Sequence, residues 1–191
     1  EEEVRVVFEL GHTSPAFRST FGTNVGIGSQ GLVMDGTEEQ KKKYLPKLAS
    51  GEMISCFALT EPEAGSDAGS LSTSAKRTGN GYVLNGTKRY ITNAPEAQLF
   101  TVFARTNAEQ PGSRGVSAFL IEAGTPGITV GAPERKMGQQ GAHIADVILE
   151  DCEVPGNALL GSTENQGFKT AMKVLDRGRL HISAVCVGIA E

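Results

Sequence analysis

The sequence predicts an α+β fold in which a middle β domain, a barrel or two packed sheets, is flanked by parts of two helical domains. Three observations lead to this class. Residues 1–53 follow helical spacing, the middle of the chain is a series of short apolar runs separated by Gly and Pro, and the last segment returns to helical spacing. Several short strands at such intervals are typical of a barrel or of paired sheets. We therefore expect domain regions at residues 1–54, 55–160 and 161–191.

The N-terminal region is expected to contain a helix with a defined start. Thr37 and Gln40 have the spacing of a capping box, and apolar residues follow at helical spacing. Pro46 is expected to end or kink this helix, and Gly51 to close it.

The middle region is expected to consist of short strands. Asn80–Gly81 and Asn85–Gly86 are tight-turn signals on either side of the run Tyr82–Leu84. Further strand-like runs are residues 99–104, 116–121 and 144–149.

The last region is expected to be one helix with a buried apolar stripe. The stripe consists of Phe168, Met172, Leu175, Ile182, Val185 and Ile189. Because the sequence opens without methionine and the helical pattern continues to Glu191, we expect the natural chain to be longer, with a helical bundle completing this region.

Composition argues against several functional classes. Hydrophobic residues are 39% and charged residues 21% of the 191, as in a globular domain, and the net charge of −4 gives no basis for binding nucleic acid. No apolar run approaches the roughly 18 residues of a membrane span.

The three cysteines are Cys56, Cys152 and Cys186. They form no CxxC pair, so we expect neither a disulfide framework nor a metal site. The histidines are His12, His143 and His181, and without triad or ligand spacing we expect them to be structural or surface residues.

Residues 26–31 match the G-x-G-x-x-G spacing of dinucleotide-binding loops. A true instance follows a buried strand and opens a helix within a βαβ unit. Residues 21–25 do not form a convincing strand, and no βαβ alternation follows. We interpret these glycines as sites of close helix packing, with nicotinamide binding as the alternative.

The segment from Cys56 to Ser70 is the strongest candidate for a binding site. An apolar strand ends near Leu59, and Thr60 and a loop rich in glycine and serine follow. Such a strand end exposes backbone N–H groups and hydroxyls, which are the donors that a flavin edge or a pyrophosphate needs. From the residues alone, a solvated loop that turns the chain is an equally good interpretation.

Residues 58–70 read ALTEPEAGSDAGS, and this run resembles the middle-domain signature of the acyl-CoA dehydrogenase family. The flanks are similar in the same order, with GTEEQKKKYLPKLASGE before it and LNGTKRYITN, TPGI, KMGQQG and FKTAMKVLDRGR after it. The resemblance covers nearly the whole chain. It implies a β-barrel-like pair of sheets between two helical domains, with FAD extended between the sheets and the C-terminal helices.

The resemblance also implies which residues contact FAD. They are Phe57, Ala58, Leu59, Thr60, Gly65, Ser66, Tyr90, Ile91 and Thr92. The Thr60 hydroxyl would donate to the N5/O4 edge of the flavin, and Gly65 and Ser66 match positions at the pyrophosphate. Tyr90 stands where relatives often have tryptophan. Its phenol offers a smaller stacking face, and an ordinary strand aromatic is the alternative.

Four residues are expected to contact the CoA moiety by the same resemblance. Ser66 is shared with the pyrophosphate site, and Ser113 precedes Arg114 in a loop that approaches the CoA phosphates in relatives. A solvated turn explains that loop equally well. Asp176 and Arg179 stand where relatives place CoA contacts on the first long C-terminal helix, and a surface i,i+3 ion pair is the alternative.

The implied reaction is FAD-dependent α,β-dehydrogenation of acyl-CoA thioesters, as in fatty acid β-oxidation. A carboxylate removes the α-proton while the β-hydrogen leaves as hydride to the flavin. In most relatives this base is a glutamate beyond the position of residue 191, and in some it immediately precedes an arginine. Here Gly178 precedes Arg179. We therefore expect no catalytic residue in this chain, and weak FAD binding and no activity from the chain alone.

The resemblance implies partners as well. An electron-transfer flavoprotein or a similar acceptor would receive the electrons, and full-length relatives form homodimers or homotetramers. A bacterial cytoplasm and a mitochondrial matrix both fit. An acyl-CoA oxidase and a non-catalytic family member used as a binding or assembly module are the alternatives. The sequence does not reveal the acyl chain length.

Overall fold

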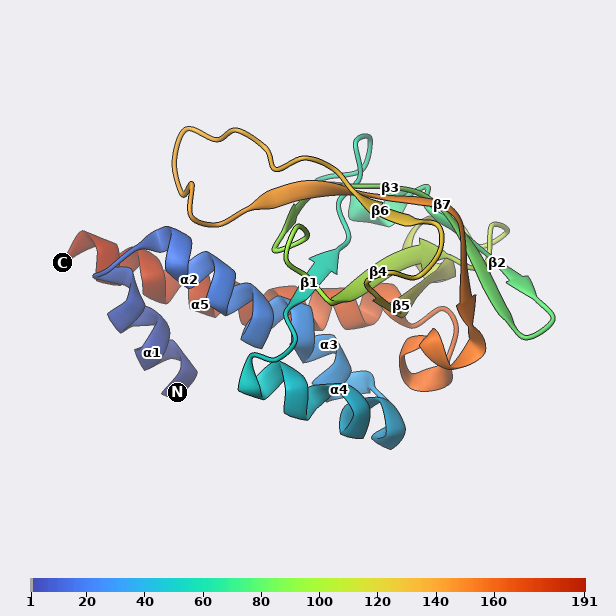
Figure 1. Cartoon of the computed structure of the whole chain (residues 1–191), viewed down its shortest axis with the longest axis horizontal. Coiled ribbons are helices and arrows are strands. Elements are labelled where there is room, and N and C mark those ends of the chain that lie inside the picture. The colour runs from blue at the N-terminus through green and yellow to red at the C-terminus, as the bar shows by residue number, and fades with distance from the viewer. Residues whose placement is uncertain (1) are drawn as a thin grey trace.

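Helices enclose one side of a curled β-sheet in this computed structural model, which describes residues 2–191 (Figure 1). The α-helices are α1 (Glu2–Gly11), α2 (Pro15–Gly22), α3 (Gly28–Asp35), α4 (Glu38–Ser50) and α5 (Gly167–Ala190). A π-helical segment, η1 (Thr23–Ile27), joins α2 to α3. The α+β class predicted from the sequence is confirmed. None of the described helices has the length and apolar character needed to span a membrane.

The sheet consists of two layers that are joined where β2 meets β4. Its strands are β1 (Ser55–Ala58), β2 (Ser74–Thr78), β3 (Gly81–Thr92), β4 (Leu99–Arg105), β5 (Val116–Glu122), β6 (Ile128–Val130) and β7 (Ile144–Pro155). One layer contains β1, β4 and β5, and the other contains β2, β3, β7 and β6. A single bridged pair, Ser74 with Arg105, joins them. The expected paired-sheet arrangement is therefore present as one continuous, curled sheet.

Apolar side chains fill both faces of the β1–β4–β5 layer. Toward the second layer, Phe100 and Phe119 pack with Leu84 and Val147. The remaining side chains of β4 and β5 pack on α3, α4 and α5 through residues such as Val174. Because both faces are covered, β4 and β5 are buried along almost their whole length, which explains their continuous apolar runs.

Helix α4 begins as predicted and extends past its proline. Thr37 Oγ1 accepts from the Gln40 N–H at 3.2 Å, and Gln40 Oε1 accepts from the Thr37 N–H at 3.0 Å. The helix ends at Gly51, which has a φ of 78°. The prediction that Pro46 could end the helix was wrong. Pro46 and Lys42 are both exposed, so water can bond the Lys42 carbonyl that the proline leaves without an N–H donor.

Only one of the two Asn-Gly signals is a turn. Asn80–Gly81 connects β2 to β3, whereas Asn85–Gly86 lies inside β3, where the pairing with β7 shifts register. Gly86 has a φ of 150°, and a Cβ at this position would lie 2.4 Å from Thr73 Oγ1. The second turn prediction was therefore wrong, because Asn85–Gly86 continues β3 opposite a β-bulge whose extra residue lies in β7, and Gly86 packs closely against Thr73.

Helix α5 buries only part of the predicted stripe. Its buried residues are Gly167, Thr170, Ala171, Val174, His181, Ala184, Val185 and Gly188. Of the predicted stripe, Val185 is buried and Phe168, Met172 and Leu175 are half-buried, whereas Ile182 and Ile189 are exposed. Small residues determine the buried face, because α1 crosses α5 closely. A Cβ on Gly188 would lie 2.2 Å from the Phe8 carbonyl oxygen.

The G-x-G-x-x-G segment lies in helices and follows no strand. A Cβ on Gly28 would lie 2.5 Å from Ser55 Oγ and 2.8 Å from the Thr23 carbonyl oxygen. Gly28 is therefore a site of close packing, but it packs against strand β1 and not against a second helix as predicted, and no βαβ unit surrounds it. The cysteines are free thiols: Cys56 and Cys152 are buried, and Cys186 is exposed.

Candidate functional site

A cavity of about 550 Å³ opens between the end of β1, the bulged part of β3 and helix α5. It brings together predicted residues from distant segments: Phe57, Leu59, Thr60, Gly65, Ser66, Tyr90, Ile91, Thr92, Ser113 and Arg179. Ala58 and Asp176 do not line it. Ala58 points to the opposite face of β1, into the core between the sheet layers, so only its backbone is available to a ligand.

Sequence reasoning missed the wall that α5 contributes. Phe168, Met172 and Leu175 face this cavity, together with Ile27 of η1. Their spacing along the helix was visible in the sequence. It indicated a buried packing face, whereas these side chains remain half-buried at a cavity. The loop residues Asp67, Ala68, Gly69 and Gly112 and the helical residue Thr23 were also missed, and no side-chain pattern distinguishes them.

The polar wall offers hydrogen-bond donors while its nearby carbonyls are occupied. The Thr60 carbonyl accepts from the Arg89 N–H at 2.8 Å, and the Leu59 carbonyl accepts from Lys88 Nζ at 3.2 Å. Among residues 2–191, nothing bonds the Thr60 hydroxyl or the backbone N–H groups of residues 65–67. This wall therefore suits a ligand that presents acceptors.

Tyr90 reaches the cavity because β3 is irregular there. Its φ is 57°, and the register against β7 shifts between Lys88 and Ile91. The bulge leaves the Tyr90 ring 60% exposed at the cavity edge, while Ile91 returns to the core. Arg89 lies over this ring, with its guanidinium carbon 5.8 Å from the ring centroid, and pairs with Asp146 at 3.0 Å.

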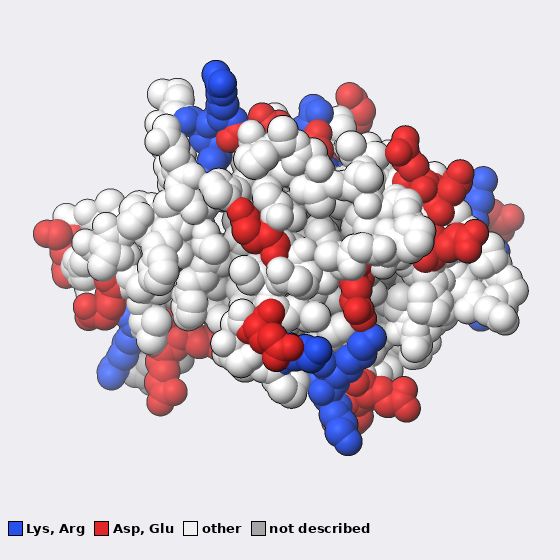
Figure 2. All heavy atoms as spheres, in the orientation of Figure 1, with Lys and Arg blue, Asp and Glu red and all other residues white. Residues whose placement is uncertain are grey.

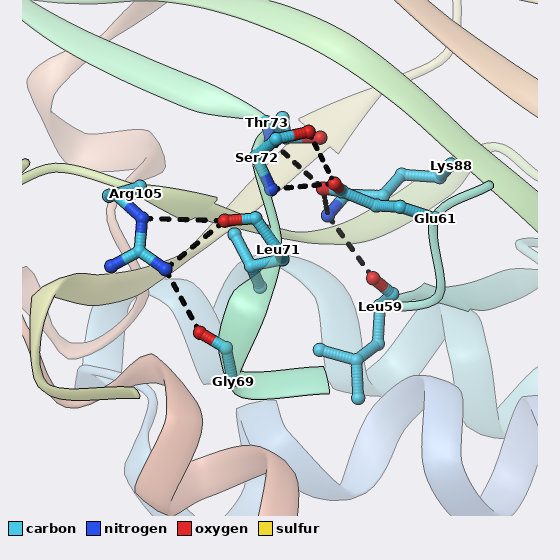
Figure 3. Close-up of polar contacts among 8 residues, drawn as sticks. All are labelled: Leu59, Glu61, Gly69, Leu71, Ser72, Thr73, Lys88 and Arg105. Carbon is cyan, nitrogen blue, oxygen red and sulfur yellow. Dashed lines mark hydrogen bonds and ion pairs between the residues drawn. The ribbon is translucent and has the colours of Figure 1, made fainter. Parts of the chain in front are cut away.

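A buried ion pair holds the loop that follows β1 (Figure 3). Lys88 Nζ lies 2.7 Å from Glu61 Oε1, and both side chains are almost fully buried. Glu61 also accepts from the backbone N–H groups of Ser72 and Thr73, at 2.6 and 2.9 Å. The pair therefore connects three segments: the end of β1, the chain before β2, and β3.

The two charges of this pair perturb each other's titration. Burial alone would raise the pKa of Glu61, but the Lys88 ammonium and the donated hydrogen bonds outweigh burial and lower that pKa to about 2. Burial lowers the pKa of Lys88 to about 8, against the opposing attraction of Glu61. Both groups are charged at neutral pH.

Arg105 holds the other half of the same loop (Figure 3). Its guanidinium donates to the carbonyls of Gly69 at 2.9 Å and Leu71 at 3.1 Å, and to that of Gly112 at 2.8 Å. The Gly112 contact brings the neighbouring Ser113 to the cavity rim, whereas Arg114 is exposed and does not line the cavity.

Asp176 and Arg179 form the exposed i,i+3 ion pair that was the alternative to CoA binding. Arg179 also borders the cavity, so the ion pair does not exclude a role for Arg179 in CoA binding, and that role stays a prediction.

These features fit a flavin. The apolar surface of Phe57, Leu59 and Phe168 suits a planar aromatic ring, and the unpaired hydroxyl of Thr60 suits an acceptor at the ring edge. The free N–H groups of residues 65–67 suit phosphate oxygens. Fold and site together define a cofactor-binding β domain that is closed on one side by a helix.

Two family models match the chain: the acyl-CoA dehydrogenase middle domain over residues 56–152 and the acyl-CoA dehydrogenase N-terminal domain over residues 1–52. The acyl-CoA dehydrogenase of Bacillus subtilis (strain 168) is 44% identical over 98% of this chain and 49% of its own length. The acryloyl-CoA reductase (NADH) of Anaerotignum propionicum is 44% identical over 100% of this chain and 48% of its own length.

Solved structures agree. Butyryl-CoA dehydrogenase from Megasphaera elsdenii matches with a TM-score of 0.94 and 38% identity, over 98% of this chain and 49% of that one. A chain from a structure of the electron transferring flavoprotein of Acidaminococcus fermentans matches with a TM-score of 0.94 and 45% identity, over 98% of this chain and 49% of that one. Acyl-CoA dehydrogenase from Bacillus anthracis complexed with FAD matches with a TM-score of 0.90 and 39% identity, over 97% of this chain and 32% of that one.

The chain belongs to the acyl-CoA dehydrogenase family, which depends on FAD and includes enzymes of fatty acid β-oxidation. It spans about half the length of the curated relatives that it matches. Those relatives include bacterial and mitochondrial proteins.

On the face drawn in Figure 2, charged side chains form small groups, in several of which acidic and basic residues lie next to each other, and wide uncharged areas separate these groups; no broad basic surface is present there.

Proposed function

We propose that this chain supplies the flavin-binding wall and part of the CoA-binding surface of an FAD-dependent enzyme that dehydrogenates acyl-CoA thioesters. One observation carries the proposal: unpaired donors at Thr60 and residues 65–67 face an apolar wall on α5 across a single cavity. Membership of an FAD-dependent family supports it. When bound, the flavin supplies the redox chemistry.

Each part of the cavity has a role in this proposal. The Thr60 hydroxyl donates a hydrogen bond to the edge of the flavin ring, and residues 90–92 hold the ring from the opposite side. The N–H groups of Gly65 and Ser66 bind the pyrophosphate. Phe168 and its neighbours on α5 exclude water from the ring, which strengthens these hydrogen bonds.

The CoA moiety is assigned to the rim of the cavity. Ser66 and Ser113 lie there on loops that Arg105 holds together. Arg179 lies at the α5 side and would offer its guanidinium to a phosphate once its contact with Asp176 opens.

The base that removes the α-proton is assigned to a part of the full-length protein outside these 191 residues. Gly178 stands before Arg179, where some relatives have the catalytic glutamate. Asp67, a carboxylate in the cavity lining, already accepts a hydrogen bond from the Ser70 hydroxyl, and we do not assign it as the base.

The electron acceptor is proposed to be an electron-transferring flavoprotein or a similar carrier, which the matched Acidaminococcus fermentans structure supports. The full-length protein is proposed to act as a homodimer or homotetramer in a bacterial cytoplasm or a mitochondrial matrix.

Anaerobic addition of acyl-CoA thioesters to the full-length, FAD-loaded protein tests the proposal. Loss of the visible flavin absorbance is expected with at least one thioester, and slow recovery in oxygen distinguishes a dehydrogenase from an oxidase. Thr60→Val should weaken FAD binding by roughly 10-fold, the worth of one hydrogen bond at this site. Thr78→Val, at the exposed end of β2, is the matched control. A protein that binds no FAD, or a flavin that stays oxidised with every thioester, would contradict the proposal.

A further inference from the structure

A second cavity, of about 430 Å³, continues from the flavin cavity between α2, η1 and α5. The two cavities share Thr23, Ile27, Leu175 and Arg179 in their linings. Much of the second lining is apolar or small, with Gly22, Gly178 and Ile182 among its residues. The two cavities therefore adjoin, and a ligand at the flavin can reach the second one past these shared residues.

Arg18 lies in this second cavity with no partner for its charge. It is 8% exposed, and its guanidinium lies against Gly22, where a Cβ would come 3.2 Å from the Arg18 Cζ atom. Its side chain forms no hydrogen bond or ion pair with any of residues 2–191, and its Nε is fully buried without a partner. Burial lowers the pKa of Arg18, but an arginine remains protonated in proteins.

His181 adds a second unsatisfied nitrogen to the same cavity. It is 3% exposed, and its Nδ1 is buried without a hydrogen bond, while its Nε2 lies 3.3 Å from a carboxylate oxygen of Glu3. That carboxylate also accepts from Arg177 at 2.8 Å. The carboxylate that reaches this part of α5 is therefore bound to other groups and does not neutralise Arg18.

A buried, unpaired guanidinium is costly, and proteins retain one where an anion completes the site. The planar fork of arginine matches a carboxylate, to which it can donate two parallel hydrogen bonds. The glycine at position 22 leaves space for the guanidinium to lie against α2, in a cavity whose lining combines apolar residues such as Ile27 and Ile182 with polar ones such as Arg179 and His181.

We propose that this cavity receives the far end of the acyl chain and that Arg18 binds a carboxylate there, so that the preferred substrates are CoA thioesters of dicarboxylic acids. This inference rests on the proposed function, which places the thioester beside the flavin. Arg18 is then a specificity-determining residue, and His181 is a second polar group near the bound carboxylate.

The test compares two CoA thioethers of equal length, one ending in a carboxylate and one in a methyl group, which bind without being dehydrogenated. Calorimetry on the full-length, FAD-loaded protein should show that the carboxylated ligand binds more tightly. Arg18→Gln should weaken the binding of that ligand by about 10- to 100-fold and leave the affinity for the methyl-ended ligand unchanged. Arg77→Gln, which removes an exposed arginine of β2, should change neither.

A second variant keeps the test usable if Arg18→Gln folds poorly. Gly22→Ala retains the charge but displaces the guanidinium, and it should also reduce the preference for the carboxylated ligand. Equal binding of the two ligands by the wild type overturns the inference. So does an Arg18→Gln protein that loses thermal stability but keeps the preference, because Arg18 would then pair with another part of the full-length protein. Flavin bleaching by acyl-CoA without any such preference would refute this inference alone and leave the proposed function standing.

Discussion

Replacing Lys88 with methionine is the sharpest perturbation of the loop that carries the candidate flavin site. Methionine keeps the length of the buried side chain but removes the ammonium that bonds Glu61 and the Leu59 carbonyl. Glu61, which is 4% exposed, would then be a buried carboxylate without its counter-charge. Breaking a buried ion pair from one side typically costs 3–5 kcal/mol.

The remaining contacts place the expected loss near the lower end of that range. Glu61 keeps three donors, from the backbone and hydroxyl of Ser72 and the backbone of Thr73, at 2.6 to 2.9 Å. We therefore expect Lys88→Met to lower the free energy of unfolding by about 3 kcal/mol. The double variant Glu61→Gln with Lys88→Met should lose less than the sum of the two single variants, because neither charge remains.

Urea unfolding of the full-length protein followed by tyrosine fluorescence and circular dichroism measures these losses. Lys76→Met is the matched control, because Lys76 is exposed on β2, and it should change the free energy by no more than about 0.5 kcal/mol. FAD affinity should also fall in Lys88→Met, since the Leu59 carbonyl next to Thr60 loses its donor. The reasoning is refuted if Lys88→Met and Lys76→Met are equally stable.

Three further outcomes are expected. The contribution of Glu61 to stability is present above its ordinary pKa of 4.5 and should be lost as pH falls through its folded-state pKa of about 2, so acid unfolding of Glu61→Gln should lack this step. Gly28→Ala should destabilise the protein by about 1–3 kcal/mol, because its Cβ would meet backbone and Ser55, whereas Gly79→Ala, in open space, should not. The isolated 191-residue chain should bind FAD weakly and show no dehydrogenation. Tight, saturable quenching of flavin fluorescence by that chain would contradict this expectation.

Local sequence signals were enough to predict the order of helical, β and helical regions and the position of the main loop, but not β2, β6 or the full length of β3. The capping box at Thr37, the strand-length apolar runs and the glycine-serine loop after Leu59 each act over a few residues, so their consequences follow from nearby chemistry. The family resemblance then indicated which cavity residues belong together. The structure brings most of them to one cavity, although it does not test their individual roles.

Features that depend on contacts between distant segments were not predictable. Strand alternation places Lys88 on the same face of β3 as the buried Tyr82 and Leu84, but a lysine in that pattern does not indicate that its charge is buried. Its pairing with Glu61, 27 residues earlier, has no local signal. The buried face of α5 likewise depends on how closely α1 approaches, and the unpaired state of Arg18 appears only when α2 and α5 lie side by side.

A crystal structure of the full-length protein with FAD tests the central claim most directly. The account predicts density for the flavin ring in the 550 Å³ cavity, with the Thr60 hydroxyl at hydrogen-bond distance from its edge and the pyrophosphate at Gly65 and Ser66. A larger hollow, of about 750 Å³, lies between α4 and β5, where Lys43 and Tyr44 already bond Glu122. Flavin density in that hollow, or a ring that does not contact Thr60, would contradict the account.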